Sequence, residues 1–220
     1  MIGTSEDTAP GEGPRAAGVQ EYYARNAALL GERYGSVTFE DVHGEVEDLL
    51  PPPPARVLDV GAGTGRDAAA LARRGYRVLA AEPVAELRAE ARRLHPDPAI
   101  EWAASALPDL RGIPRPEGGF DLVLLSAVWM HLPPEERAPA MTRLAALLAP
   151  TGLLVISLRR GTPPEGRVMY DVPAEETAAH AARAGLRVER LFSDGDDHLG
   201  RADVWWQSLS LRHAKGAEGT

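Results

Sequence analysis

Three glycines within five residues, placed directly after an apolar run, constrain this chain more than any other feature. Residues 57–67 read Val-Leu-Asp-Val-Gly-Ala-Gly-Thr-Gly-Arg-Asp and lead into a helical run at 68–74. Because glycine has no side chain, such a backbone can pass close to a bound molecule, with the amides of the helix start facing it. The stretch therefore predicts a strand, a ligand-binding turn and a helix. The alternative is a tight turn of the same shape that binds nothing.

The spacing of the glycines indicates the kind of cofactor. A dinucleotide fingerprint runs Gly-x-Gly-x-x-Gly, which counted from Gly61 requires glycine at position 66, where this chain has Arg66. Asp59 stands instead two residues before a Gly-x-Gly-x-Gly run. Glu82 then closes the next apolar strand, where a carboxylate can accept hydrogen bonds from both hydroxyls of an adenosine ribose. The alternative for Glu82 is a solvated strand end.

This arrangement resembles motif I of the class I S-adenosylmethionine-dependent methyltransferases. The resemblance covers residues 19–211 in element order, with specific motifs at 57–82 and, more loosely, at 120–131. It implies S-adenosylmethionine as the cofactor and a ribose contact for Glu82. The cofactor-binding candidates that follow are Asp59, Gly61, Ala62, Gly63, Gly65, Arg66, Asp67, Glu82, Pro83, Ser105, Ala106, Leu107, Ser126, Ala127 and Tyr23.

Two of these candidates have an equally simple structural explanation. Ser105 follows a strand at 99–104, where the family usually has an acidic or hydroxyl residue near the adenine amine, but a serine there also caps turns and helices. An aromatic pair such as Tyr22-Tyr23 often lies against the methionine portion of the cofactor in this family. A tyrosine stripe at helical spacing is equally what burial in a core selects.

The segment after the fourth strand narrows the acceptor. Residues 119–126 form an apolar run bounded by turn residues, which predicts a central strand buried on both faces. The Ser-Ala-Val-Trp sequence beyond it, at 126–129, differs from the Asn/Asp/Ser-Pro-Pro-aromatic motif of methyltransferases that act on amines in nucleic acids. It also has no carboxylate to hold a divalent ion. We therefore expect a small-molecule or peptide acceptor and no metal.

The resemblance also implies a mechanism. S-adenosylmethionine already carries a good leaving group, so the protein mainly has to align the acceptor and exclude water. Alignment can supply about 7 to 11 kcal/mol in favourable cases, which makes a general base optional. His131 is the candidate base, since an ordinary imidazole titrates near neutral pH. The alternative is that His131 only packs or contacts the cofactor.

Two loops carry polar side chains that could recognise an acceptor. In 159–173, Arg159, Arg160, Arg167 and Tyr170 could bind a carboxylate, although a solvated loop is the simpler expectation. The acid-rich segment 193–203 has the wrong register for a calcium loop, because the twelfth position counted from Asp194 is a tryptophan. We expect it to be a solvated hairpin loop, with contact to an acceptor as the alternative, and we expect Trp205-Trp206 to pack the sheet.

Composition excludes several other classes. The formal net charge of -8 and scattered arginines argue against nucleic acid, which requires clustered basic residues. The chain has no cysteine, hence no disulfide and no thiolate nucleophile or metal ligand. The first eighteen residues do not resemble a signal peptide, and no apolar run is long enough to span a membrane. A cytoplasmic protein is the expectation.

The predicted fold is α/β: a doubly wound, mostly parallel seven-stranded sheet with an antiparallel last strand, helices on both faces and an N-terminal helical lid. Residues 1–18 are expected to be a disordered tail, 19–54 the lid and a proline linker, 55–212 the S-adenosylmethionine-binding domain and 213–220 a second tail. The predicted function is methyl transfer. The alternatives are other chemistry on the same fold, or cofactor binding without catalysis.

Overall fold

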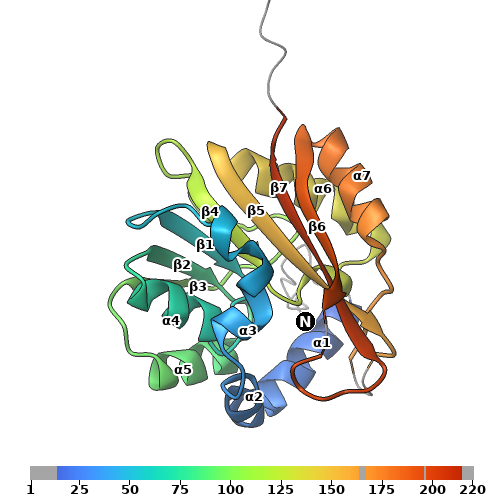
Figure 1. Ribbon diagram of the computed structural model, residues 1–220. Coiled ribbons are helices and arrows are strands. Elements are labelled where there is room, and N and C mark those ends of the chain that lie inside the picture. Colours follow the sequence, from blue (N-terminus) through green and yellow to red (C-terminus); the bar gives the residue numbers. More distant parts are fainter. Residues whose placement is uncertain (1–13, 164–166, 196, 215–220) are drawn as a thin grey trace, which may run out of the picture.

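The computed structural model describes residues 14–163, 167–195 and 197–214, which are organised around a seven-stranded sheet (Figure 1). The strands lie in the order β3-β2-β1-β4-β5-β7-β6. The pairings among β1 to β5 are parallel, and β7 runs antiparallel to both β5 and β6, which confirms the predicted sheet. The strands are β1 (Arg56–Val60), β2 (Arg77–Ala81), β3 (Ile100–Ala103), β4 (Phe120–Leu125), β5 (Leu148–Gly161), β6 (Leu186–Gly195) and β7 (Val204–His213).

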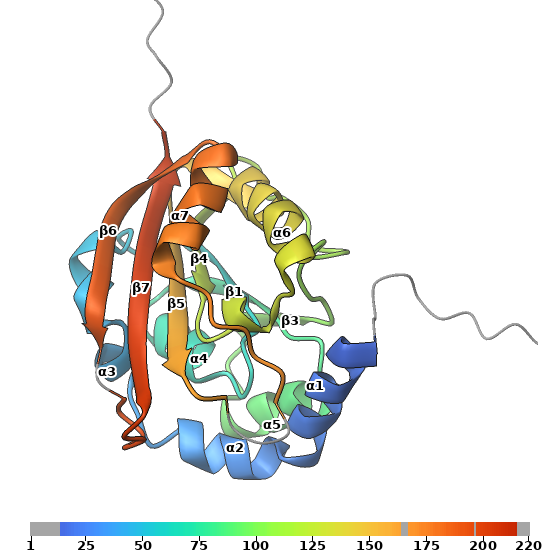
Figure 2. The same ribbon diagram turned by 90° about the vertical axis from the view of Figure 1, so that its right-hand side faces the viewer.

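Helices cover both faces of the sheet, as Figures 1 and 2 show. Residues of β4 alternate between two cores: Leu122 and Leu124 face one, and Val123 and Leu125 face the other. The central strand is therefore buried on both faces, as its unbroken apolar run predicts. The first core is closed by α3 (Phe39–His43) and α4 (Arg66–Arg73), and the second by α6 (Pro134–Leu147) and α7 (Ala174–Arg183).

The N-terminal segment differs in detail from its prediction. The first helix, α1 (Pro14–Arg25), begins five residues earlier than expected, so residues 14–18 are helical and not a tail. Proline is favoured in the first helical turn, and alanine favours helix, which accounts for the earlier start. Residues 1–13, the rest of the predicted tail, lie outside the described part of the chain.

The helical lid predicted within 19–54 is divided into several short helices. Asn26 separates α1 from α2 (Ala27–Tyr34), and its side-chain amide donates to the Tyr22 carbonyl oxygen over 2.7 Å. The lid continues with the short α3 and a 3-10 helix, η1 (Gly44–Leu49). Both α1 and α2 pack against α5 (Ala85–Leu94), and Figure 2 shows them near the end of the sheet where β5 finishes.

The C-terminal strands are longer than expected. β5 continues to Gly161, so the first residues of the predicted loop belong to the sheet, and β6 continues to Gly195. Trp205 was predicted to pack the sheet, but it is 43% exposed. Its ring centroid lies 4.8 Å from the central carbon of the Arg160 guanidinium. Residues 215–220 of the predicted second tail, and Asp196 of the acid-rich loop, lie outside the described residues.

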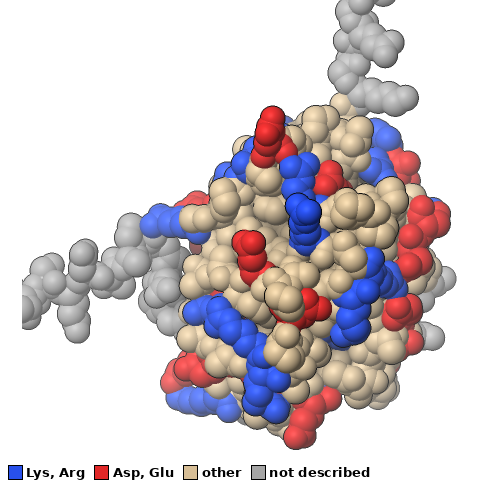
Figure 3. Space-filling model, turned by 90° about the vertical axis from the view of Figure 1, so that its left-hand side faces the viewer, with Lys and Arg blue, Asp and Glu red and all other residues tan. Residues whose placement is uncertain are grey.

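The surface and the helices add two further findings. Figure 3 shows basic and acidic side chains intermingled on the face that it draws. Because a polyanion needs a continuous basic surface, this face does not suit one. Among the helices of the described residues, none is both long and apolar enough to cross a membrane.

Candidate active site

A cavity of about 940 Å³ opens at the carboxyl ends of β1, β2, β4 and β5. This is the edge at which a doubly wound sheet places its ligands, beside the switch in strand order between β1 and β4. Every cofactor-binding candidate except Gly65, and the candidate base His131, lines this cavity. The lining candidates are Tyr23, Asp59, Gly61, Ala62, Gly63, Arg66, Asp67, Glu82, Pro83, Ser105, Ala106, Leu107, Ser126, Ala127 and His131.

The glycines of the turn have different structural roles. Gly61 has a φ of +68°, and a Cβ there would lie 2.5 Å from a methyl carbon of Val128, so packing against the β4 loop requires glycine. Gly63 has a φ of +56°, and a Cβ there would meet no atom closer than 4.0 Å. Gly63 thus presents bare backbone to the cavity.

Gly65 corrects the sequence-based expectation. A Cβ at this position would contact Trp102, Ala91 and His95, at 3.1 to 3.3 Å. Gly65 therefore permits close packing of the start of α4 against β3 and α5 and does not face the cavity. The third glycine of such a turn has the same packing role in dinucleotide-binding folds.

Glu82, directly after β2, is a buried residue and not a solvated strand end. Its Oε2 accepts a hydrogen bond from the Gly63 amide and its Oε1 accepts one from the Val84 amide, both over 2.9 Å. Burial raises the pKa of this carboxyl, and the two amides oppose that rise. The carboxylate lies on the cavity wall with oxygen lone pairs still available, as recognition of a hydroxyl pair requires.

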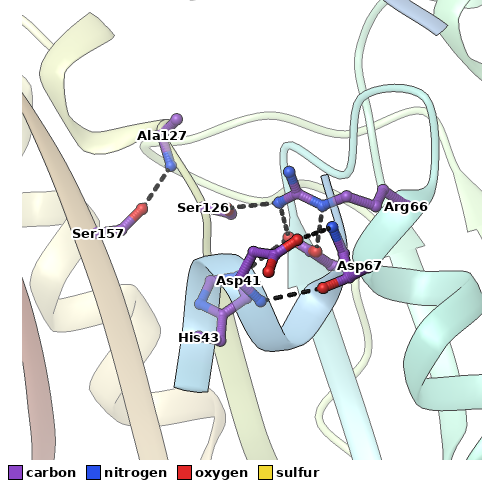
Figure 4. Close-up of polar contacts among 8 residues, drawn as sticks. Asp41, His43, Arg66, Asp67, Ser126, Ala127 and Ser157 are labelled. Atoms are coloured by element: carbon purple, nitrogen blue, oxygen red, sulfur yellow. Dashed lines mark hydrogen bonds and ion pairs between the residues drawn. The ribbon is translucent and has the colours of Figure 1, made fainter. Parts of the chain in front are cut away.

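A buried charged cluster lies beside the turn (Figure 4). Arg66 and Asp67 form a bidentate ion pair, with nitrogen–oxygen distances of 2.7 and 2.8 Å, and His43 of α3 lies 3.1 Å from Asp67 Oδ2. Burial alone would raise the pKa of Asp67, but the charge of Arg66 and the contact with His43 hold it far below its usual value. The sequence gives no local sign of His43, because it lies 24 positions before its partner.

Asp59 lies beside the same cluster, and one of its two carboxylate oxygens accepts no hydrogen bond from the described residues. Its Oδ2 is buried and has no hydrogen-bond partner among the described residues. Burial and the nearby Asp67 raise the pKa of Asp59 well above its usual value. Since Asp59 also lines the cavity, a ligand that brings an N–H donor or a positive charge would satisfy this oxygen. An adenosyl amino acid has such a group, so the residues present fit S-adenosylmethionine.

The β4 loop carries a strained backbone. Ala127 has a φ of +59°, which is unfavourable for a residue with a side chain. Its amide donates to Ser157 Oγ over 2.9 Å, and Ser126 Oγ lies 3.4 Å from the Arg66 guanidinium (Figure 4). Ser157, on β5, was not among the candidates. These contacts hold the loop against the glycine turn.

Ser105 also makes the contact expected of a turn cap. Its hydroxyl donates to the carbonyl oxygen of Arg111 over 2.8 Å, although the residue lines the cavity. The capping interpretation therefore holds for its side chain, and the adjacent Ala106 and Leu107 face the cavity as well.

His131 and Tyr23 meet across 108 positions of sequence. His131 Nδ1 lies 2.9 Å from the Val168 carbonyl oxygen, so this nitrogen carries the proton and Nε2 accepts from the Tyr23 hydroxyl over 3.2 Å. Burial and then the nearby arginines lower the pKa of His131, which keeps the ring neutral. Tyr23 packs with Ala27, as the burial interpretation expects, and it also lines the cavity, while its contact with the cofactor stays a prediction.

The sequence favoured a solvated loop at 159–173, but the arginines of this segment are not uniformly solvated. Arg159 and Arg167 are buried and line the cavity. Arg160 is not a cavity residue and pairs with Asp171, its Nε lying 2.6 Å from Oδ1. Tyr170 lines the cavity next to the guanidinium of Arg137. These four residues differ in burial and in access to the cavity because of how segments distant in sequence pack around them.

The acid-rich hairpin also reaches the cavity. Asp197 accepts from the Arg201 amide over 2.8 Å and from the Trp206 indole over 3.2 Å, and all three residues line the cavity. Burial alone would raise the pKa of Asp197, but these hydrogen bonds lower it to about 2. Among the described residues, no three His, Asp or Glu side chains gather in a way that could hold a metal. The expectation of a purely solvated loop is therefore wrong for this segment.

Comparison with known proteins agrees with this geometry. Residues 57–152 match the model of a methyltransferase domain. An uncharacterised methyltransferase of Mycobacterium tuberculosis is 33% identical over 109 residues, which are 50% of this chain and 42% of that protein. The chain thus matches less than half the length of that relative.

Two solved structures share the fold at low identity. The 1,6-didemethyltoxoflavin-N1-methyltransferase of Burkholderia thailandensis, with its substrate and S-adenosylhomocysteine bound, superposes with a TM-score of 0.68, 22% identity and coverage of 94% of this chain and 93% of that one. The [4+2]-cyclase SpnF superposes with a TM-score of 0.66, 17% identity and coverage of 89% and 95%. Residues 57–152 therefore contain a methyltransferase domain, and the sheet as a whole has the fold of methyltransferases that bind S-adenosylmethionine or its demethylated product.

Proposed function

We propose that this chain transfers the methyl group of S-adenosylmethionine to a small-molecule or peptide acceptor without a metal. The observation that carries the proposal is a single cavity with two differently built ends. At one end the bare backbone of Gly63 lies hydrogen-bonded to the buried carboxylate of Glu82. At the other end, Tyr23, His131 and Arg167 form a polar network suited to a second molecule.

The first end supplies the groups for the cofactor. In this proposal Glu82 accepts the ribose hydroxyls, and 105–107 border the adenine. Asp59 and Arg66, beside the turn, bind the ammonium and carboxylate of the amino-acid portion. The cofactor supplies a methyl group on a sulfonium whose leaving group is a thioether. The chain's own task is to hold the acceptor in line and exclude water, which can contribute about 7 to 11 kcal/mol.

His131 is the proposed general base. It is neutral, its Nδ1 proton is held by the Val168 carbonyl, and its Nε2 lone pair accepts from a hydroxyl that borders the cavity. An acceptor O–H or N–H that replaced the Tyr23 hydroxyl at Nε2 could give its proton to this nitrogen as the methyl bond forms. The Val168 carbonyl then positions the ring through Nδ1, and the Tyr23 ring stays in edge-to-face contact with it.

The test is incubation of the protein with methyl-labelled S-adenosylmethionine and a panel of candidate acceptors. The proposal expects label in the acceptor and one equivalent of S-adenosylhomocysteine. Because the cyclase shares this fold, a second outcome is an altered acceptor with the cofactor unchanged, which would favour non-methylating chemistry. Cofactor binding without turnover of any acceptor would favour a binding protein.

A further inference from the structure

The far end of the cavity contains two buried arginines with unusual partners. Arg159, on β5, is 6% exposed and lies on the same strand face as Ser157, opposite Trp206 of β7. Among the described residues, its guanidinium donates only to the Gly161 and Thr162 carbonyl oxygens, over 3.2 and 2.8 Å, and to the Met169 sulfur. Its Nε is buried without a partner among the described residues.

Arg167 is held in the same way by neutral groups. It is 9% exposed, and its Nη1 donates to the hydroxyls of Tyr23 and Tyr34, each over 3.3 Å. Its guanidinium carbon lies 4.9 Å from the Tyr22 ring centroid and 5.5 Å from that of Tyr23. Its Nε is also buried and has no partner in the described part of the chain. Aromatic faces and phenol oxygens thus orient the cation but do not neutralise it.

Elsewhere this protein pairs its buried arginines with carboxylates. Arg66 pairs with Asp67, and Arg137 pairs with Glu176. Within the described residues, neither Arg159 nor Arg167 has a carboxylate within 4.0 Å, and the nearby Asp197 already binds Arg201. Burying a cation without an anion is costly, and burial and the charges of Arg201 and Arg167 lower the pKa of Arg159. An anionic ligand in the cavity would supply these guanidinium groups with the counter-charge that the described residues do not give them.

The surroundings of these arginines describe the remainder of that ligand. Tyr34, Val168, Phe192, Leu199 and Trp206 also line the cavity, and these side chains are mostly apolar. Tyr34 contacts Arg167, and Trp206 lies opposite Arg159 on β7. A planar guanidinium fork matches a carboxylate in two parallel hydrogen bonds. We propose that the acceptor is a small organic anion: an apolar, flat body that bears a carboxylate bound by Arg159 and Arg167. This inference rests on the proposed function, because it names the class of the second substrate.

The carboxylate of the cofactor itself is the rival occupant. Arg66, however, lies at the glycine turn and beside Ser126, next to the unpartnered Asp59 oxygen. Arg159 belongs to β5 and Arg167 to the segment after it, and Arg167 contacts the tyrosines of α1 and α2. The structure therefore provides separate cations for the two ligands, and the experiment distinguishes them.

The test is calorimetric titration of the protein, with and without saturating S-adenosylhomocysteine, using probes matched in shape but not in charge. Suitable pairs are benzoate with benzamide, 2-naphthoate with 2-naphthamide, and indole-3-acetate with its amide. The carboxylates should bind at least tenfold more tightly than their amides. In Arg159→Gln and Arg167→Gln this preference should fall about tenfold to 100-fold, as for loss of a charged hydrogen bond. The affinity for S-adenosylhomocysteine should stay within about twofold.

Arg160→Gln is the matched control, because Arg160 lies next to Arg159 on the same strand but pairs with Asp171 away from the cavity. It should keep the carboxylate preference in full. If either glutamine variant fails to fold, Arg159→Lys or Arg167→Lys keeps the charge without the fork and should show an intermediate preference.

Three results would overturn the inference. The first is equal affinity for acids and amides, or no binding of any carboxylate at millimolar concentration. The second is a preference that survives in both arginine variants. The third is a parallel loss of S-adenosylhomocysteine affinity, which would assign these arginines to the cofactor. Failure of the wild-type protein to bind S-adenosylhomocysteine at all would instead count against the proposed function, while the cofactor-free titration would still test the arginines.

Discussion

At the scale of single residues, Glu82 connects the turn to the cavity. Its two oxygens accept the Gly63 and Val84 amides, so the same carboxylate that faces the ligand also fixes the backbone that approaches it. Replacement by glutamine keeps the shape and one acceptor oxygen but loses the charge. We expect Glu82→Gln to weaken S-adenosylhomocysteine binding about tenfold to 100-fold by calorimetry. Glu86→Gln, on the exposed side of α5, should leave the affinity unchanged.

His131 predicts how activity depends on pH. Because burial lowers its pKa, the ring is neutral at pH 7, and only the neutral ring can accept a proton. Once an acceptor is known, kcat should be flat above about pH 6.5 and decline only at a lower pH than for a free imidazole. His131→Gln should reduce kcat about 10²-fold or more and remove this decline. A decline that persists in the variant would exclude His131 as the base.

Asp67 predicts a large effect on stability. Its carboxylate is the shared partner of Arg66, whose side chain is 20% exposed, and of the buried His43, so Asp67→Asn leaves a largely buried cation without its anion. The free energy of unfolding in urea should fall by about 3–5 kcal/mol. Since the folded pKa of Asp67 is depressed, its stabilisation is present above the unfolded value, about 3.9, and is lost as the pH falls below it towards the folded value.

The control for this variant is Asp48→Asn. Asp48 also pairs with an arginine, Arg190, but its side chain is 65% exposed, and exposed pairs contribute little. The free energy of unfolding should hardly change. Comparable losses in the two variants would contradict the structural role assigned to the buried cluster.

At the scale of elements, the glycine turn could be predicted from sequence because its constraints are local. The motif is a strand, a glycine run and a helix, followed by an acid at the end of the next strand, and its key residues all lie within 59–82. Asp59, two of the three glycines and Glu82 line the cavity, and Gly65 does not. The break at Asn26 and the 3-10 form of η1 were not predicted, since helix ends depend on hydrogen bonds that the periodicity of side chains does not report.

Gly63 tests the turn directly. The methyl group of an alanine at position 63 would meet no protein atom closer than 4.0 Å. It would therefore enter the space that the cofactor needs in this account. Gly112 also has a positive φ, +75°, and an open Cβ position, but it lies away from the cavity. Alanine at either position should cost about 1–2 kcal/mol of stability through backbone strain.

The two alanine variants should differ in binding. Gly63→Ala should weaken S-adenosylhomocysteine binding by about tenfold or more, because the close approach of backbone to ligand is blocked. Gly112→Ala should bind as the wild type does. Equal affinities in both variants would show that the backbone at Gly63 does not touch the cofactor.

At the scale of the whole molecule, the second half of the site is formed by segments that are distant in sequence. Arg167 meets Tyr23 across 144 positions and Tyr34 across 133. A pattern in one sequence cannot report such pairings, which is why Arg159 and Arg167 were expected to be solvated and His43 was not considered. The fold and the glycine turn could be predicted, whereas the side-chain contacts around Arg159 and Arg167 required the structure.

The whole arrangement has a direct consequence for binding. If the turn, Glu82 and the cluster around Asp59 form one cofactor site, the intact protein should bind one molecule of S-adenosylhomocysteine without any other ligand. A nicotinamide dinucleotide should not bind, because the third glycine of its fingerprint is replaced by Arg66.

Calorimetric titration of the folded wild-type protein with S-adenosylhomocysteine tests this most directly. We expect one site per chain with a dissociation constant on the order of micromolar, and no heat from a nicotinamide dinucleotide. Absence of heat with S-adenosylhomocysteine at several temperatures, from protein that unfolds cooperatively, would contradict the assignment of the cavity to that cofactor.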